Sequence, residues 1–329
     1  ISTACRCYCY KNNNPYLCRM LETKIGTDIS YAATLLQQGE VVAIPTETVY
    51  GLAGNALDTH SIEKIYIAKQ RPLFNPLILH THSIDAIKQF AQITEATITI
   101  AQHFMPGALT LLLPKKSIVP DLLTAGSSKV AVRIPNHHVT LALLQQLPFP
   151  LAAPSANRSG RISPTLASHV QEELQGRVDK IIDGGACAVG VESTVVDVTE
   201  EMPVILRHGA ITQEMLERVV GKLRVAAADS AIKSPGMLEK HYAPDAELRL
   251  NARAVEADEA LLAFGAPLKG AAVVENLSDT CDLKEAAANL FRMLRQLDAG
   301  GAKKIAVMPV PHEGLGVAIN DRLQRAATK

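Results

Sequence analysis

Short apolar runs alternate with helical patterns along most of this chain, and this alternation limits the fold more than any other feature. The run at residues 41–44 has the length of a buried strand and breaks at Pro45 into a polar turn. Residues 61–70 repeat apolar side chains at the spacing of one helix face. The alternation predicts α/β layers. Adjacent strand patterns between residues 178 and 207 indicate a mixed sheet rather than a uniformly parallel one.

The pattern breaks at residues 233–248, where two prolines and a glycine interrupt it. A length of 329 residues is sufficient for two domains. We therefore expect a first domain at 20–225, a linker at 226–245 and a small parallel α/β domain at 246–329. In the last of these, strands are expected at 247–250, 271–277 and 303–310, and helices at 283–300 and 316–327.

The start of the chain is unusually rich in cysteine, with four of the six cysteines at Cys5, Cys7, Cys9 and Cys18. A metal clip is one interpretation, but this spacing is not that of a zinc finger and no histidine lies nearby. We instead expect residues 1–19 to be a disordered extension. The other two cysteines are isolated, as is typical of proteins in a reducing cytoplasm.

Charge is balanced overall, with 33 Lys plus Arg and 33 Asp plus Glu, which argues against a nucleic-acid coat protein. Residues 98–171 are an exception, because they contain six Lys and Arg residues and a single acidic residue, Asp121. That local excess favours an anionic ligand. No apolar stretch has the length of a membrane-spanning helix.

Common phosphate and nucleophile motifs are absent from the sequence, including G-x-x-x-x-G-K-[ST], G-x-G-x-x-G, H-E-x-x-H and G-x-S-x-G. The nearest approach, starting at Gly185, has Val191 in place of the lysine. No motif for a metal site is found.

Polar and cationic side chains instead follow the ends of several apolar strands. Lys69 and Arg71 end a helix directly before Pro72, and Arg133 lies inside an apolar strand, where a charge is costly unless it is paired or faces a cleft. Each feature alone also fits a structural role, such as cations at a helix end or a core histidine at His80. Together they predict one rim of cations and hydroxyls suited to phosphate and carboxylate.

Six blocks in this order resemble the YrdC-like domain of threonylcarbamoyl-adenylate synthases: "PTETVYGL", "KQRPLFNPLILH", "MPGALTLLLP", "VAVRIPNH", "APSANRSG" and "VESTVVDV". The resemblance covers residues 25–222, and "SPGMLEKHYAP" and "GLGVAINDRLQRAA" are similar to the longer, two-domain form. It implies a mixed, twisted sheet with a concave positive cleft, followed by a Rossmann-like C-terminal domain. The family usually has Pro-Gly-Pro where this chain has Pro106-Gly107-Ala108, which we expect to affect turn rigidity.

The resemblance implies a cytoplasmic nucleotidyltransferase that forms L-threonylcarbamoyladenylate and pyrophosphate from L-threonine, bicarbonate and ATP with Mg²⁺. The product would feed threonylcarbamoyladenosine formation in tRNAs reading ANN codons, through downstream transfer machinery. Stable direct binding of tRNA is not expected, nor is a membrane.

The same resemblance assigns the site residues. Lys69 and Arg71 are the predicted catalytic cations. Threonine would be held by Thr48, His80, Arg133, the backbone of Ala153 and Ser193, with Arg133 pairing its carboxylate. ATP would be held by Arg71, Asn75, Lys129 through its backbone, Ser155, Asn157, Ser163, Arg207 and Tyr242. We expect the linker, with Lys240, His241 and Tyr242, to close over ATP as a lid that keeps water from a labile mixed anhydride; a passive spacer is the alternative.

Two other functions are compatible with the sequence. One is an RNA-binding module that uses the same basic cleft, against which the neutral total charge counts. The other is a carbamoyl-transfer enzyme using carbamoyl phosphate, but the hydrogenase maturation proteins of that kind carry zinc-finger and acylphosphatase segments that this sequence lacks.

Overall fold

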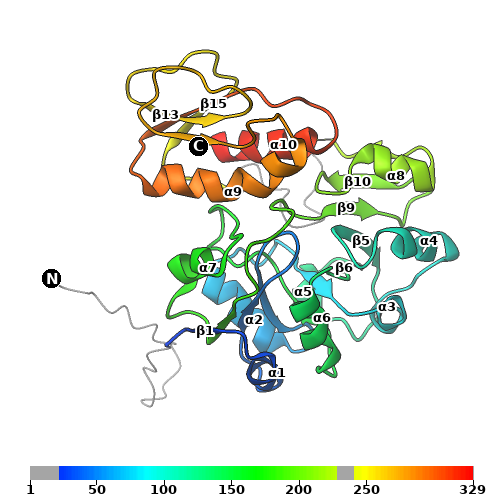
Figure 1. Cartoon of the computed structure of the whole chain (residues 1–329). Helices are drawn as coiled ribbons and strands as arrows, with labels where there is room; N and C mark the ends of the chain where they lie inside the picture. Colours follow the sequence, from blue (N-terminus) through cyan, green and yellow to red (C-terminus); the bar gives the residue numbers. More distant parts are fainter. Residues whose placement is uncertain (1–21, 228–240, 329) are drawn as a thin grey trace.

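The computed structural model describes residues 22–227 and 241–328, which form a large mixed α/β part and a small parallel one (Figure 1). The expected extension at 1–19 and Lys240 of the linker lie outside the described residues.

The large sheet has 11 strands in the described residues. In spatial order they are β1 (Lys24–Gly26), β8 (Lys180–Ile182), β2 (Val42–Ile44), β3 (Gly51–Asn55), β7 (Leu151–Ala152), β4 (Ile78–His80), β6 (Lys129–Arg133), β5 (Leu109–Pro114), β9 (Thr194–Asp197), β10 (Val204–Arg207) and β11 (Arg224–Val225). The predicted mixed sheet is confirmed, because β9 and β10 are antiparallel whereas β4 and β6 are parallel.

The helices of the large part are α1 (Ile29–Gln37), α2 (Thr59–Lys69), α3 (Ile84–Phe90), α4 (Glu95–Phe104), α5 (Asp121–Thr124), α6 (His138–Gln145), α7 (Ala167–Leu174) and α8 (Gln213–Val220). α2 begins where the Asp58 carboxylate accepts hydrogen bonds from the backbone of His60 and Ser61. It ends as predicted before Arg71-Pro72, with Gln70 in the left-handed conformation.

One helix begins later than the sequence pattern predicts. Ser163-Pro164 has the signature of a helix start, but α7 begins at Ala167 after an extended Leu166. The Pro164 carbonyl accepts a hydrogen bond from the Tyr50 amide (2.8 Å), and the Ser163 hydroxyl donates to the Glu192 carboxylate (2.7 Å). These tertiary contacts hold the segment outside the helix.

Strand register decides which side chains meet at one edge of the sheet. His80 and Arg133 are direct partners at the ends of the parallel strands β4 and β6. β9 begins at the same edge, because Thr194 pairs with Leu109 and β5 runs antiparallel to β6. Lys129 begins β6 and therefore lies at the opposite edge.

The small part has a sheet whose strands run parallel in the order β12 (Glu247–Arg249), β15 (Lys304–Val307), β13 (Glu259–Ala263) and β14 (Val274–Asn276). Its helices are α9 (Leu283–Ala299) and α10 (Leu315–Ala327), which lie between this sheet and the large part (Figure 1). The expected parallel C-terminal domain is thereby confirmed, although no strand was predicted at β13.

The two parts share a hydrophobic cluster in which Val49, Ile162 and Val191 of the large part pack with Tyr242 and Phe291. Gly190 lies directly against α9: a Cβ atom there would come within 2.4 Å of the Ala287 carbonyl oxygen. A glycine is needed at this position for the close approach, and also for its φ of +76°.

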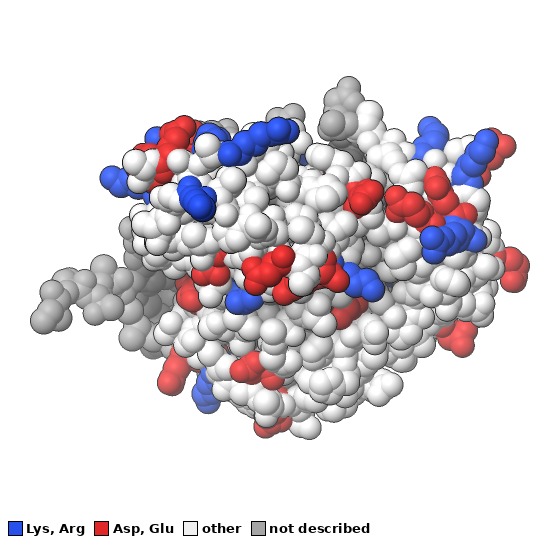
Figure 2. Space-filling model, turned by 45° about the horizontal axis from the view of Figure 1, so that its top comes forward, with Lys and Arg blue, Asp and Glu red and all other residues white. Residues whose placement is uncertain are grey.

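Surface charges of both signs are interspersed on the face of the molecule that Figure 2 shows. Among the described residues on that face, no continuous basic patch of the kind that grips a nucleic-acid backbone is visible. The described helices include none with the length and apolar character needed to span a bilayer.

Candidate active site

Lys69 ends α2 with its side chain fully enclosed, and its ammonium donates hydrogen bonds to the backbone carbonyls of Ser155 and Asn157. Burial, and then the neighbouring Arg71 cation, holds the pKa of Lys69 well below its ordinary value. The Asn157 side-chain amide in turn donates to the Arg158 and Arg161 carbonyls (2.8 and 2.9 Å). The predicted lysine therefore meets two of the predicted ATP residues.

Arg71 is also buried, and it donates to the backbone carbonyls of Asn75 (3.1 Å) and Pro76 (2.9 Å). Burial lowers its pKa to about 10, so it stays cationic at neutral pH. Within the described residues neither Lys69 nor Arg71 forms an ion pair with a carboxylate. Asn75 is fully buried, and its amide nitrogen and oxygen both lack a hydrogen-bond partner among these residues. Two buried basic side chains without an ion-pair partner, beside an unsatisfied amide, favour an anionic, hydrogen-bonding ligand.

The predicted threonine end lies where β4 and β6 finish. His80 is buried, with its Nδ1 3.1 Å from the Ile78 carbonyl oxygen. Burial, and after it the charge of Arg133, lowers the pKa of His80 to about 3, so the imidazole is neutral at pH 7. Thr48 is buried in the loop after β2, where its hydroxyl lies 2.9 Å from that of Thr46.

Arg133 pairs with a carboxylate that is not among the predicted site residues. Its Nη2 lies 2.7 Å from Glu47 Oε1, without hydrogen-bond geometry, and its Nε donates to the Gly107 carbonyl (3.2 Å). The cost of a charge inside an apolar strand was a signal for such a partner. Glu47 thus occupies a position beside Arg133 that the carboxylate of an amino acid could also use.

Ser193 is tied to two elements. Its hydroxyl lies 2.7 Å from that of Thr110, and Arg207 at the end of β10 donates to its carbonyl (3.1 and 2.8 Å) and hydroxyl (3.1 Å). Gly209 permits this arrangement, because a Cβ atom there would come within 2.4 Å of the backbone of Glu192, Ser193 and Thr194. The structure thereby joins the predicted threonine residue to the predicted ATP residue Arg207.

Tyr242 and His241, from the C-terminal side, complete a buried cluster with Lys69, Arg71 and Arg207. Tyr242 is buried, has a φ of 63° and stacks on Phe291 at 5.3 Å between ring centroids. His241 packs edge-on against it at 4.0 Å, and burial lowers the pKa of His241 to about 3. The charges of Lys69, Arg71 and Arg207 all act on His241.

Two of the predicted residues have other partners in the sheet. Lys129 lies at the opposite sheet edge, where its ammonium pairs with the buried Asp197 carboxylate (2.8 Å). The Ala153 amide donates to the Ile78 carbonyl (3.0 Å) and is thus used within the sheet. The predicted roles of these two residues, like those of the other site residues, stay predictions.

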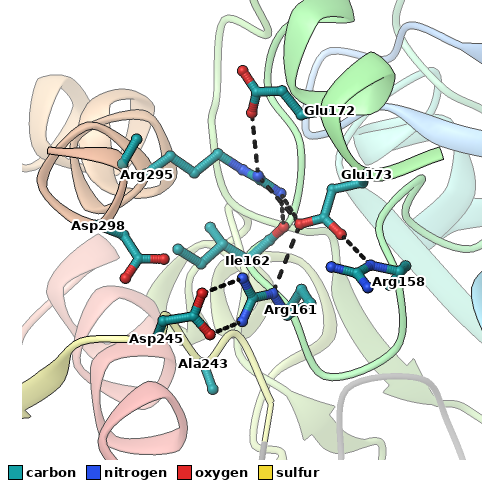
Figure 3. A pocket seen from close by; sticks show the side chains of 10 residues that line it. Arg158, Arg161, Ile162, Glu172, Glu173, Ala243, Asp245, Arg295 and Asp298 are labelled. Carbon is teal, nitrogen blue, oxygen red and sulfur yellow. Dashed lines mark hydrogen bonds and ion pairs between the residues drawn. The ribbon is translucent and has the colours of Figure 1, made fainter. Parts of the chain in front are cut away.

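Two cavities flank the cluster rather than contain it. One of about 250 Å³ lies between the two parts, where Arg158, Arg161 and Arg295 turn toward Glu173 (Figure 3). The other, of about 470 Å³, lies between residues 159–161 and 243–248. Lys69, Arg71 and Arg133 line neither cavity, because these side chains are buried by other protein atoms.

Comparison with known proteins agrees with this architecture. A family model named Sua5, YciO and YrdC, described as "Telomere recombination", matches residues 34–209, and one described as "Threonylcarbamoyl-AMP synthase, C-terminal domain" matches residues 211–328. The threonylcarbamoyl-AMP synthase of Pyrococcus abyssi is 42% identical over 321 residues, covering 91% of this chain and 94% of that protein. The Bacillus subtilis enzyme of the same name is 41% identical, with 91% and 92% covered. This chain belongs to the threonylcarbamoyl-AMP synthase family.

Solved structures agree with membership of the synthase family. The crystal structure of P. abyssi Sua5 complexed with L-threonine has a TM-score of 0.86 at 39% identity, covering 93% of this chain and 97% of that one. Escherichia coli YciO has a TM-score of 0.51 at 23% identity and covers 57% of this chain and 94% of its own, a likeness of fold alone. The resemblance of the sequence to the long, two-domain form of the synthase is confirmed.

Proposed function

We propose that this chain is a threonylcarbamoyl-AMP synthase, a nucleotidyltransferase that makes L-threonylcarbamoyladenylate and pyrophosphate from L-threonine, bicarbonate and ATP. The observation that carries the proposal is the pair of buried basic side chains, Lys69 and Arg71, which form no ion pair with a carboxylate among the described residues. Both act electrostatically on His241, and Arg71 also on Arg207. The names of the relatives and the threonine complex of the P. abyssi protein support it. The RNA-binding alternative is not favoured.

The chemistry needs positioning more than a protein nucleophile. The threonine amine forms a bond to the carbon of bicarbonate, and water leaves, which gives an N-carboxylate. One oxygen of this carboxylate attacks the α-phosphorus of ATP while the bond to the bridging oxygen breaks, and pyrophosphate leaves with that electron pair. Holding the three anionic reactants together can contribute roughly 7–11 kcal/mol.

The residues divide that task by charge. Lys69, Arg71 and Arg207 would stabilise the phosphates and the charge that builds on the leaving pyrophosphate. Arg133 would receive the threonine carboxylate in place of Glu47, and the neutral His80 beside it adds no competing charge. Exclusion of water by the buried Tyr242 would protect the mixed anhydride.

Magnesium would enter with ATP and neutralise phosphate charge. The described residues contain no cluster of three or more His, Cys, Asp or Glu side chains that could hold a metal. An ion that keeps its waters and binds mainly phosphate oxygens would need few protein carboxylates.

The deciding experiment is incubation with ATP, bicarbonate and labelled threonine. We expect the labelled adenylate and pyrophosphate in equal amounts, both lost when bicarbonate is removed. Pyrophosphate release that persists without bicarbonate would indicate simple activation of the amino acid and contradict the proposal. A gel shift with tRNA at moderate salt tests the RNA-binding alternative.

The further destination of the product is part of the proposal. The adenylate would pass to transfer machinery in the cytoplasm that modifies tRNAs reading ANN codons. Supplying that machinery with product made by this chain, and measuring threonylcarbamoyladenosine in tRNA, tests this step.

A further inference from the structure

A fully buried arginine on α10, Arg322, contacts the large part of the structure. The Nε of Arg322 donates to Oε2 of Glu192 (3.0 Å), and its Nη1 donates to Asp321 (2.7 Å). Glu192 belongs to the loop before β9, 130 residues earlier in the chain. A buried, charge-assisted hydrogen bond therefore joins the two parts.

Glu192 also contacts one predicted substrate residue and is adjacent in sequence to another. Its second oxygen accepts from the Ser163 hydroxyl (2.7 Å), and its neighbour in sequence is Ser193, which Arg207 holds. Burial would raise the pKa of Glu192, but the charges of Arg322 and Arg207 and the Ser163 hydroxyl outweigh it and lower the pKa to about 2. The carboxylate is thus ionised and fixed by partners on both sides.

The same guanidinium reaches the linker tyrosine. The Arg322 carbon Cζ lies 5.5 Å from the centre of the Tyr242 ring, which also stacks on the ring of Phe291 on α9. A cation over an aromatic face is attracted to it. Ser163 and Tyr242, both predicted to hold ATP, are therefore fixed through one side chain of the C-terminal part.

We propose that Arg322 is a positioning residue for the nucleotide: it orients Ser163 through Glu192 and holds Tyr242 over the cluster. This inference rests on the proposed function. It assigns the C-terminal part a role in catalysis that does not require it to touch a substrate.

A stabilising role alone explains the contact poorly. A buried ion pair is often no more stabilising than apolar residues of similar volume, because both charges lose their hydration. The shared cluster around Phe291 already buries apolar surface between the two parts. What the ion pair adds is a directional contact that sets one arrangement of α10 against the loop at Glu192.

The test is steady-state kinetics of the full chain with the Arg322→Met, Glu192→Gln and double variants. Arg253→Met is the matched control, because Arg253 is an exposed arginine of the same part. For Arg322→Met we expect KM for ATP to rise at least about tenfold, because the variant loses a charge-assisted hydrogen bond. The change in KM for threonine should be much smaller. The double variant should have a higher KM for ATP than Glu192→Gln, because it also loses the cation over the Tyr242 ring. Arg253→Met should match the wild type.

Wild-type KM for ATP in a folded Arg322→Met variant would overturn the inference, as would equal rises for both substrates. If Arg322→Met does not fold by circular dichroism, the double variant decides: a KM for ATP equal to that of Glu192→Gln would overturn the inference, and a higher one supports it. A wild-type enzyme that makes no adenylate would instead refute the proposed function.

Discussion

Replacing Glu47 with glutamine tests how the site compensates its buried charge. Glu47 and Arg133 lie 2.7 Å apart, with only 10% and 5% of their side chains exposed. Removing one partner from a buried pair typically costs about 3–5 kcal/mol, because the remaining charge is left without compensation. At roughly 2–4 °C per kcal/mol for a domain of this size, the melting temperature should fall by about 6–20 °C.

A matched pair on the surface supplies the control. Glu40 and Lys64 lie 2.8 Å apart, but a third or more of each side chain is exposed. Because exposed pairs contribute about 0–1 kcal/mol, Glu40→Gln should lower the melting temperature by less than about 4 °C.

Thermal unfolding followed by circular dichroism at pH 7.5 measures both variants. Saturating threonine should stabilise Glu47→Gln more than the wild type, because its carboxylate supplies the partner that Arg133 has lost. Equal losses in Glu47→Gln and Glu40→Gln would refute the reasoning from burial. Equal stabilisation of wild type and Glu47→Gln by threonine would refute the assignment of Arg133 to the substrate carboxylate.

Three further predictions concern His241, Tyr242 and Lys129. The pKa of His241 is about 3 in the folded chain and about 6.5 when unfolded. Its contribution to stability is therefore complete above pH 6.5 and declines as pH falls toward 3, by about 1.4 kcal/mol per unit. In urea unfolding between pH 6.5 and 4.5, the pH slope of His241→Gln should be shallower by that amount; identical slopes would contradict the burial of this imidazole. Tyr242→Ala should weaken ATP binding and lower turnover, and unchanged values for both would reject the lid. Lys129→Met should lower stability, because Asp197 is left buried without its cation, but raise KM for ATP less than Arg71→Met does. Equal rises would place the Lys129 side chain at the nucleotide.

Three segments of the fold differ from what their local sequence predicts, because contacts with distant segments decide their conformation. β13 has the sequence EALLA, rich in good helix formers, and becomes a strand because β15 and β14 pair with it on both sides. β3 reads GLAGN, where two glycines weaken the strand signal, yet it pairs with β2 and β7. Ser163 and Pro164 have the local signature of a helix start, but the segment is held by contacts with Glu192 and Tyr50.

Local pattern by itself determined the α/β class, the mixed sheet and the parallel C-terminal part, because apolar periodicity and proline act over a few residues. The characteristic blocks marked the family and the polar residues of the site. Only the tertiary structure decided which of them meet: strand register put His80 beside Arg133 and sent Lys129 to the far edge. It also paired Arg133 with Glu47 and Arg322 with Glu192. Such partners are chosen by the packing of distant segments, which no local spacing records.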